Sequence, residues 1–149
     1  MEFGWISLFG AGITVLLLIP NVLYAFGRQA EEDMQISKGV IIAEQVGRYA
    51  CIMLMWLPLL VGKFAFKSPE EFLIYFIGNL LLIVLYYLFW ILYSFRKKLY
   101  MALVLTIVPT VVFLLSGLLL RHWLLVFAGL LFGACHIYIT YRNNCDDKK

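Results

Sequence analysis

Long stretches without a charged residue alternate along the chain with short polar segments. Four of these stretches contain no Lys, Arg, Asp or Glu over 20 residues or more. A bilayer core about 30 Å thick needs about 20 helical residues at 1.5 Å per residue, so each stretch is long enough to cross a membrane. They run from Phe3 to Gly27, Phe72 to Phe95, Leu99 to Leu120 and His122 to Tyr141.

A fifth apolar stretch, Val40 to Gly62, is interrupted by two charges. Glu44 and Arg48 precede a clean segment, Tyr49 to Gly62, that is too short to span a membrane alone. Residues four apart lie on one face of a helix, where opposite charges can pair. Ser37 precedes the stretch and is a residue type that favours the N-cap of a helix. We therefore predict that this stretch also spans the membrane as a helix.

The predicted fold is all-α: a polytopic membrane protein with five transmembrane helices in one bundle, forming a single domain over residues 1–149. Backbone polar groups in hydrocarbon must be bonded within their segment, and uninterrupted apolar runs indicate helices rather than the alternating strands of a barrel. The first stretch lacks the basic region and cleavage site of a signal peptide, so we expect it to be retained. The predicted helices span residues 3–27, 40–62, 72–95, 99–120 and 122–141.

Composition supports a membrane protein. Hydrophobic residues make up 64% of the chain and charged residues 14%, with a mean hydropathy of +0.92, whereas soluble domains carry about 25% charged residues. The net charge of +3 gives no sign of a nucleic-acid partner. Cys51, Cys135 and Cys145 form no CxxC pair, so neither a metal site, a disulfide framework nor a cofactor is predicted.

The distribution of basic residues predicts the orientation, because cytoplasmic loops carry an excess of Lys and Arg. With the amino terminus outside and the carboxyl terminus in the cytoplasm, eight basic residues fall on the cytoplasmic side and three on the other. The eight are Arg28, Lys38, Arg96, Lys97, Lys98, Arg142, Lys148 and Lys149, and the three are Lys63, Lys67 and Arg121.

Polar residues inside the predicted helices are the candidate functional residues. An ionisable group at the centre of a span costs about 2.5–3.5 kcal/mol, so each one needs a physical reason. In the predicted topology Asn21, Glu44, Arg48 and His136 reach a similar depth on the cytoplasmic side, and they would converge on a polar cavity there. Asn79 lies in the outer half of its helix and is a fifth candidate ligand-binding residue.

Structural roles for the same residues stay open. Glu44 and Arg48 can form an interfacial ion pair whose long side chains reach the lipid headgroups without any ligand. His136 stands without a second histidine or a supporting acid at metal-ligand spacing, which favours a hydrogen bond to a neighbouring helix over metal binding.

Small residues at four-residue spacing predict close helix contacts. Gly129 and Gly133 form a GxxxG pair, and Gly39, Ala43 and Gly47 form a similar ridge. Such ridges let two helix backbones approach closely in a membrane. Spacing alone does not decide whether the contacts lie within one chain or between chains.

Three prolines fall inside the predicted helices, at Pro20, Pro58 and Pro109. Each lacks an N–H group and frees the carbonyl four residues earlier. Thr106 and Thr110 flank the last proline and could bond such a carbonyl. The freed carbonyls and the kinks are either tolerated structural features or room for a ligand.

Aromatic residues are dense between Phe72 and Phe95. Tyr75, Asn79, Tyr86 and Trp90 lie near one face of the predicted helix. A stripe of this kind can line a pocket for a flat apolar or cationic molecule, or it can pack the core and anchor the helix at the interface.

Five segments carry a resemblance to known proteins: Leu18 to Ala25, Glu44 to Tyr49, Phe72 to Tyr75, Leu114 to Leu125 and Phe132 to Tyr141. They resemble an uncharacterised family of small five-helix integral membrane proteins of Gram-positive bacteria. The resemblance implies a multi-pass protein of the bacterial cytoplasmic membrane, and it implies no activity and no catalytic residue. Size and helix count are also similar to those of the tryptophan-rich translocator family, which implies architecture alone.

Two functions follow from these patterns. The first is binding or transport of a small molecule or a lipid through the cytoplasmic-side polar cavity. The second is a structural or accessory membrane subunit, including a homo-oligomer, that assembles through the glycine ridges. An enzyme is the weaker interpretation, because no paired carboxylates, no nucleophile with a base and no metal-ligand spacing stand out in the sequence.

Overall fold

The computed structural model describes residues 7–27, 36–61 and 65–146, and in them the chain folds into five α-helices. The all-α fold class is therefore confirmed. Predicted helical residues 3–6 lie outside the described residues. The helices are α1 (Leu8–Gly27), α2 (Lys38–Trp56), α3 (Pro69–Phe95), α4 (Leu99–Leu119) and α5 (Trp123–Asp146).

The end of α2 differs from the prediction, which placed Pro58 inside the helix. The helix ends at Trp56, and Leu57 takes an extended conformation with φ −117° and ψ 129°. A residue before proline is forced away from the helical region by the pyrrolidine ring, so Pro58 terminates α2 rather than kinking it. Ser37 occupies the N-cap position of the helix, but its side chain makes no capping hydrogen bond.

The start of α3 also differs, because α3 begins three residues before the charge-free run. Ser68 is the N-cap residue, and its hydroxyl accepts a hydrogen bond of 3.3 Å from the backbone N–H of Glu71. Pro69 suits the first helical position, and acidic residues in the first turn complement the helix dipole. A cap, a proline and the acids Glu70 and Glu71 thus extend the helix beyond its apolar part.

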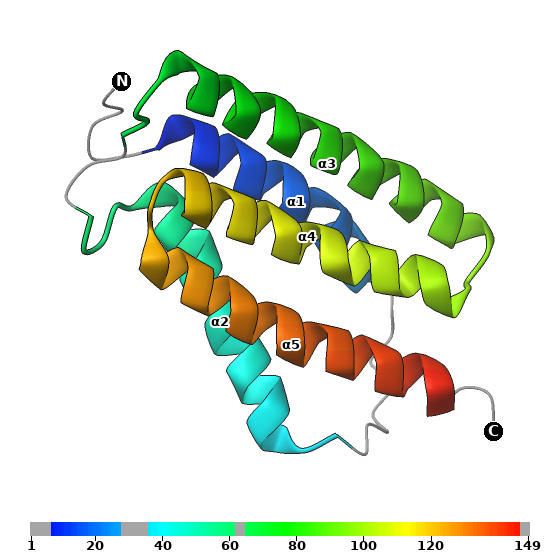
Figure 1. The fold of residues 1–149 in the computed structure, drawn as a ribbon. Coiled ribbons are helices and arrows are strands. Elements are labelled where there is room, and N and C mark those ends of the chain that lie inside the picture. The colour runs from blue at the N-terminus through cyan, green and yellow to red at the C-terminus, as the bar shows by residue number, and fades with distance from the viewer. Residues whose placement is uncertain (1–6, 28–35, 62–64, 147–149) are drawn as a thin grey trace.

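The helices form one bundle in which α5 packs between α2 and α4, and α4 packs between α5 and α3. Helix α1 contacts α2 and α3. Figure 1 shows α1, α3, α4 and α5 running along the length of the molecule, whereas α2 crosses them at a steep angle. The backbone N–H of Ser7 donates to the carbonyl of Trp56 at 3.1 Å, so α1 and α2 meet where α1 starts and α2 ends.

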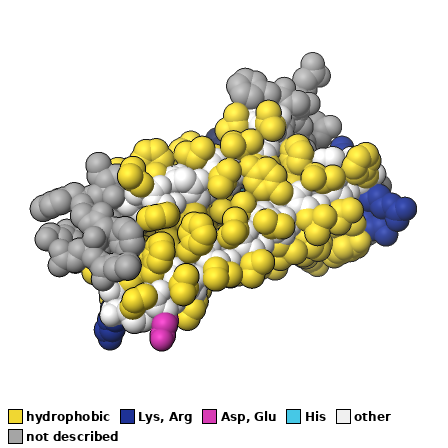
Figure 2. All heavy atoms as spheres, turned by 90° about the horizontal axis from the view of Figure 1, so that it is seen from above, with side chains coloured by type: hydrophobic (Ala, Val, Ile, Leu, Met, Phe, Trp, Pro, Cys, Tyr) yellow, Lys and Arg dark blue, Asp and Glu magenta, His cyan; other side chains and the backbone are white. Residues whose placement is uncertain are grey.

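Three of the five helices are long and apolar enough to cross a membrane: α3, α4 and the part Trp123–Asn144 of α5. The apolar part of α1 covers Leu8–Leu23 among the described residues and is shorter, and α2 contains charged residues. Figure 2 shows one face of the molecule covered with hydrophobic side chains, with the charged side chains gathered toward its ends. An apolar surface of this kind is typical of a membrane protein.

Glycines bring the helices together at the predicted ridges, and the contacts lie within the chain. A Cβ atom added to Gly47 of α2 would lie 2.9 Å from the backbone nitrogen of Phe132 in α5. A Cβ added to Gly133 of α5 would overlap the Thr110 side chain in α4, and one added to Gly129 would lie 3.3 Å from Leu114. The GxxxG pair therefore joins α5 to α4.

Gly39, the first residue of the predicted ridge, contacts no other helix among the described residues. Gly39 is exposed, and among the described residues a Cβ added to it would meet only the Ser37 hydroxyl, at 3.7 Å. Ala43, the middle residue of the same ridge, is half-buried. The reason is the steep crossing of α2, which brings only the part of this ridge near Gly47 against α5.

His122 lies in the turn between α4 and α5 and is buried. Its Nε2 lies 2.8 Å from the carbonyl oxygen of Leu59, and it must carry the proton because a carbonyl only accepts. Burial lowers the pKa of His122, while backbone carbonyls of Leu59 and Leu54 oppose this shift. The folded protein thus favours the neutral imidazole.

This pKa shift predicts a loss of stability in mild acid. Because the pKa is lower in the folded state, the unfolded chain binds more protons below the ordinary histidine pKa of about 6.5, and stability falls as the pH drops below that value. We expect a lower melting temperature at about pH 5.5 than at about pH 7.5. His122→Asn should remove this difference, whereas His136→Gln, the matched change at the other of the two histidines, should keep it. If the melting temperature of His122→Asn still falls between these two pH values, another group causes the loss of stability.

Candidate functional site

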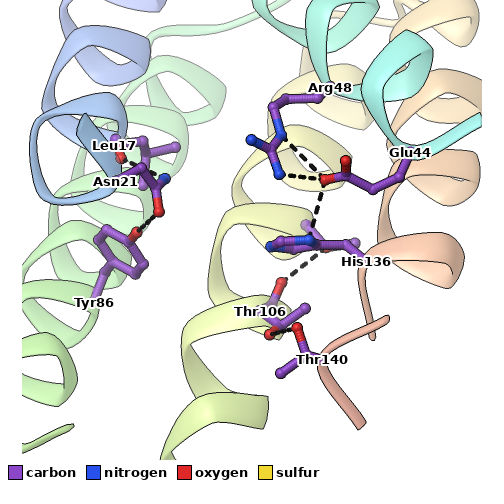
Figure 3. Close-up of polar contacts among 9 residues, drawn as sticks. Leu17, Asn21, Glu44, Arg48, Tyr86, Thr106, His136 and Thr140 are labelled. Atoms are coloured by element: carbon purple, nitrogen blue, oxygen red, sulfur yellow. Dashed lines mark hydrogen bonds and ion pairs between the residues drawn. The ribbon is translucent and has the colours of Figure 1, made fainter. Parts of the chain in front are cut away.

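The carboxylate of Glu44 is the centre of a three-residue cluster between α2 and α5. Its Oε1 atom accepts hydrogen bonds from Nε of Arg48, at 3.1 Å, and from Nη2 of the same side chain. Nδ1 of His136, in α5, lies 3.1 Å from the same oxygen. Figure 3 shows the three side chains converging from the two helices. One buried carboxylate thus positions both a guanidinium and an imidazole.

The cluster faces the inside of the bundle. The Glu44 side chain is 3% exposed and that of Arg48 is 33% exposed. This differs from an interfacial pair reaching into the headgroups, in which both side chains would extend outward. The contact of His136 in α5 with Glu44 in α2 is a hydrogen bond between helices, which is the interpretation that the sequence favoured over metal binding.

Phe132 supports both positively polarised partners of Glu44. The guanidinium carbon of Arg48 lies 5.9 Å from the centroid of the Phe132 ring. The rings of Phe132 and His136 are stacked, with centroids 4.9 Å apart and an interplanar angle of 22°. Phe132 reaches this place because Gly47 leaves room for its backbone. A glycine contact between helices therefore shapes the site.

A pocket opens beside the cluster. It is partly open to the outside and has a cavity volume of about 40 Å³, which corresponds to roughly three water molecules at about 10–15 Å³ each. All five helices contribute to its wall, which is apolar except for a few side chains. The lining residues are Thr14, Leu17, Leu18, Asn21, Arg48, Ile52, Tyr86, Leu105, Pro109, Phe113, Phe132 and His136.

Asn21 and Tyr86 form the polar part of the opposite wall. The Tyr86 hydroxyl donates to Oδ1 of Asn21 at 3.2 Å, and Nδ2 of Asn21 donates to the carbonyl of Leu17 at 3.2 Å. In Figure 3 this pair lies on one side and Arg48 and His136 lie on the other. The wall thus offers dipoles but no charge.

The structure brings together four of the five predicted site residues. Asn21, Arg48 and His136 line the pocket, and Glu44 lies directly behind the last two. Asn79 does not belong to the site. Its Nδ2 lies 3.3 Å from the hydroxyl of Ser116 in α4 and 2.8 Å from the carbonyl of Tyr75, so it joins α3 to α4 elsewhere. The binding role of the other four stays a prediction.

Phe132 is a residue of the site that was not among the predicted site residues. A signal was available, since Phe132 precedes His136 by one helical turn and shares its face. Tyr86 belongs to the aromatic stripe of α3 and does line the pocket, whereas Trp90 of the same stripe does not.

Pro20 and Pro109 lie inside helices, and the carbonyls that they free differ in their hydrogen-bond partners. Pro20 of α1 frees the carbonyl of Leu16, and the Tyr87 hydroxyl of α3 donates to that oxygen at 2.8 Å. This contact ties α1 to α3. Pro109 lines the pocket, and the neighbouring threonines bond the carbonyls of Ala102 and Thr106 rather than that of Leu105, contrary to expectation.

Two further observations bound the chemistry of the site. Within residues 7–27, 36–61 and 65–146, no group of three or more His, Cys, Asp and Glu side chains is arranged to hold a metal ion. The hydroxyls of Thr106 and Thr140 lie 3.1 Å apart below the cluster and join α4 to α5. The described pocket wall therefore offers a ligand hydrogen bonds and one charge, that of the Arg48 guanidinium.

No protein-family model, curated protein or solved structure matches the chain. Membership of the Gram-positive membrane protein family stays a prediction. The class of protein defined by the fold is an all-α bundle with three helices apolar enough to cross a membrane.

Proposed function

We propose that the chain is an integral membrane protein of five membrane-spanning helices, and that it binds a small molecule or a lipid in the pocket beside Glu44. In this proposal the amino terminus lies outside, and the carboxyl terminus lies in the cytoplasm of a bacterial cell. Two observations support α2 as a fifth span. Its charged pair is turned into the bundle, and its opposite face carries the exposed side chains of Ile42, Val46, Tyr49 and Met53.

The observation that carries the binding proposal is the partial exposure of Arg48 to the pocket. A buried ion pair contributes little net stability compared with apolar residues of the same size, and charges within a span are costly. A purely stabilising role therefore gives a weak reason for the presence of Glu44 and Arg48 in this helix. A ligand that contacts the exposed part of the Arg48 guanidinium gives a stronger one.

The alternative function, assembly with other subunits through the glycine ridges, has less support. Gly129 and Gly133 contact α4 of the same chain, and Gly47 contacts α5. The predicted ridge surfaces are thus occupied inside the bundle. Gly39, the remaining glycine of the ridges, is exposed and meets no other helix in the part of the chain that the structure describes.

Blocking the pocket tests the binding proposal. Ile52 is a half-buried residue of the pocket wall, and Ile52→Trp adds volume there. Ile42 lies on the same helix and is 62% exposed, so Ile42→Trp is a matched control outside the pocket. The proteins are purified in mild detergent, and native mass spectrometry measures any small molecule that stays bound.

We expect a bound mass in the native protein and in Ile42→Trp, and its loss in Ile52→Trp. A bound mass that survives unchanged in Ile52→Trp would place binding at another surface and contradict the proposal. Far-UV circular dichroism of both variants shows whether each retains the native helix content.

A further inference from the structure

We propose that the ligand of this pocket carries an acidic group, a carboxylate or a phosphate, which Arg48 binds beside an apolar chain. This inference rests on the proposed function and specifies the chemical class of its ligand. It follows from which member of the buried ion pair faces the pocket.

The positive member of the pair faces the ligand and the negative member does not. Arg48 lines the pocket with a side chain that is 33% exposed, whereas Glu44 is 3% exposed and is not a lining residue. Among the described residues of the pocket wall, Arg48 is the only one with a permanent charge. A cation would meet this guanidinium without access to the carboxylate behind it, so the pocket selects against cations.

Arg48 has hydrogen-bond donors left for a ligand. A guanidinium carries five N–H donors, and only those of Nε and Nη2 are used toward Glu44. Contact with the carboxylate and the Phe132 ring holds the guanidinium plane in place, which lowers the entropy that ligand binding would otherwise remove. Hydrogen bonds between charged partners are stronger than neutral ones, and more so in a medium of low dielectric constant.

His136 can add to the binding of an acid. Its Nδ1 must carry a proton to bond the carboxylate of Glu44, since an ionised carboxylate only accepts. In Figure 3 the rest of the ring points toward the side of Asn21 and Tyr86. When the ring also carries a proton on Nε2, both nitrogens are donors, so Nε2 can bond the acidic group of the ligand as well. Glu44 acts here as a positioning residue for both ligand-binding groups.

The size of the pocket indicates how the ligand sits. The cavity volume of about 40 Å³ accommodates a group of roughly three heavy atoms if each takes the room of a water molecule. A carboxylate has that size. The remaining wall is formed by apolar side chains such as Leu17, Leu18 and Ile52, and the pocket is partly open. An apolar chain attached to the acidic group can therefore follow this wall toward the opening.

A set of compounds with one alkyl chain and different head groups tests the inference. Hexanoate, hexanol and hexylammonium are added to the full-length protein in nonionic detergent, and intrinsic tryptophan fluorescence follows thermal unfolding. We expect hexanoate to raise the melting temperature most and hexylammonium least. Equal stabilisation by hexylammonium or by hexanol would overturn the inference.

Two further arms distinguish the source of the acidic ligand. Acetate and inorganic phosphate are tested at the concentrations used for hexanoate. Stabilisation by hexanoate without an effect of acetate or phosphate supports an acid with an apolar chain, such as a fatty acid from the membrane. Equal stabilisation by acetate or phosphate supports a soluble anion.

Variants connect the effect to Arg48. The double substitution Glu44→Gln with Arg48→Gln removes both charges and leaves no charge buried alone, and we expect the affinity for hexanoate to fall about tenfold, as for loss of one charge-assisted hydrogen bond. Lys98→Gln, at an exposed position between α3 and α4, is the matched control and should keep the native affinity. Arg48→Lys keeps the charge, so it should keep the preference for hexanoate over hexylammonium even if the double variant does not fold.

Failure of this inference is distinguishable from failure of the proposed function. If all three hexyl compounds stabilise equally and Ile52→Trp removes the effect, the pocket binds ligands without regard to charge and only the inference is wrong. If Ile52→Trp leaves every stabilisation unchanged, binding lies outside the pocket and both are wrong. Preference for hexanoate that persists in the double Gln variant would also contradict the role of Arg48.

Discussion

Replacing Arg48 alone with glutamine is expected to lower the free energy of unfolding by about 3–5 kcal/mol, the usual cost of leaving a buried charge without its partner. The carboxylate of Glu44 is buried and accepts two hydrogen bonds from Arg48. Its remaining partner, His136, contributes a full opposing charge only when protonated. The measurement is equilibrium unfolding in mixed micelles, followed by far-UV circular dichroism.

The double variant Glu44→Gln with Arg48→Gln distinguishes the effect of removing the whole ion pair from the effect of removing one partner. Two amides of similar shape leave no charge buried alone, so we expect the double variant to recover most of the stability that the single variant loses. Lys98→Gln is the matched surface control, because Lys98 is exposed and its replacement should have little effect. If the single and double variants lose the same stability, the Glu44–Arg48 contact makes no contribution and the cluster has been misassigned.

The second large effect is expected for Gly47→Ala. The added Cβ would lie 2.9 Å from the backbone nitrogen of Phe132 and 3.0 Å from its Cα. These are backbone atoms of a packed helix and cannot move aside without shifting α5. Overpacking of this kind costs about 1–3 kcal/mol, and it also displaces Phe132 from its contacts with Arg48 and His136.

Gly39→Ala is the control for this prediction, because it makes the same change on the same helix at a position where, among the described residues, the added Cβ would make only an ordinary contact with the Ser37 hydroxyl, at 3.7 Å. Alanine has a higher helix propensity than glycine, so the control should be neutral or slightly stabilising. Opposite signs for the two substitutions, measured by unfolding in mixed micelles, are the expected result. Equal effects at both positions would mean that α2 does not approach α5 closely at Gly47.

The helices could largely be predicted from the sequence, because apolar runs report directly which segments avoid water. The predicted helix 99–120 and the observed α4, Leu99–Leu119, differ by one residue. The predicted helix boundaries are wrong where a helix begins or ends at a different residue from its apolar run. Pro58 ends α2 through backbone sterics, and the Ser68 cap starts α3 within a polar segment. Neither effect depends on hydrophobicity.

The candidate site could be predicted in part. The spacing of Glu44 and Arg48 made their pairing predictable, and placing residues by depth brought Asn21 and His136 into the same group. The hydrogen bond from His136 to Glu44 was not predictable, because it depends on how closely α5 approaches α2 at Gly47. Asn79 was assigned to the ligand-binding residues because it is polar, but its bonds to Ser116 and Tyr75 give it a structural role.

The sequence by itself determined the all-α class, the membrane-like apolar surface and the position of each polar residue along its helix, since these depend on composition and on the regular rise of a helix. The tertiary structure decided which faces meet: that α2 crosses the other helices steeply, that Gly47 but not Gly39 is a contact, and that Arg48 rather than Glu44 faces the pocket. The physical reason is that the rotation and crossing of a helix are set by close packing against its neighbours.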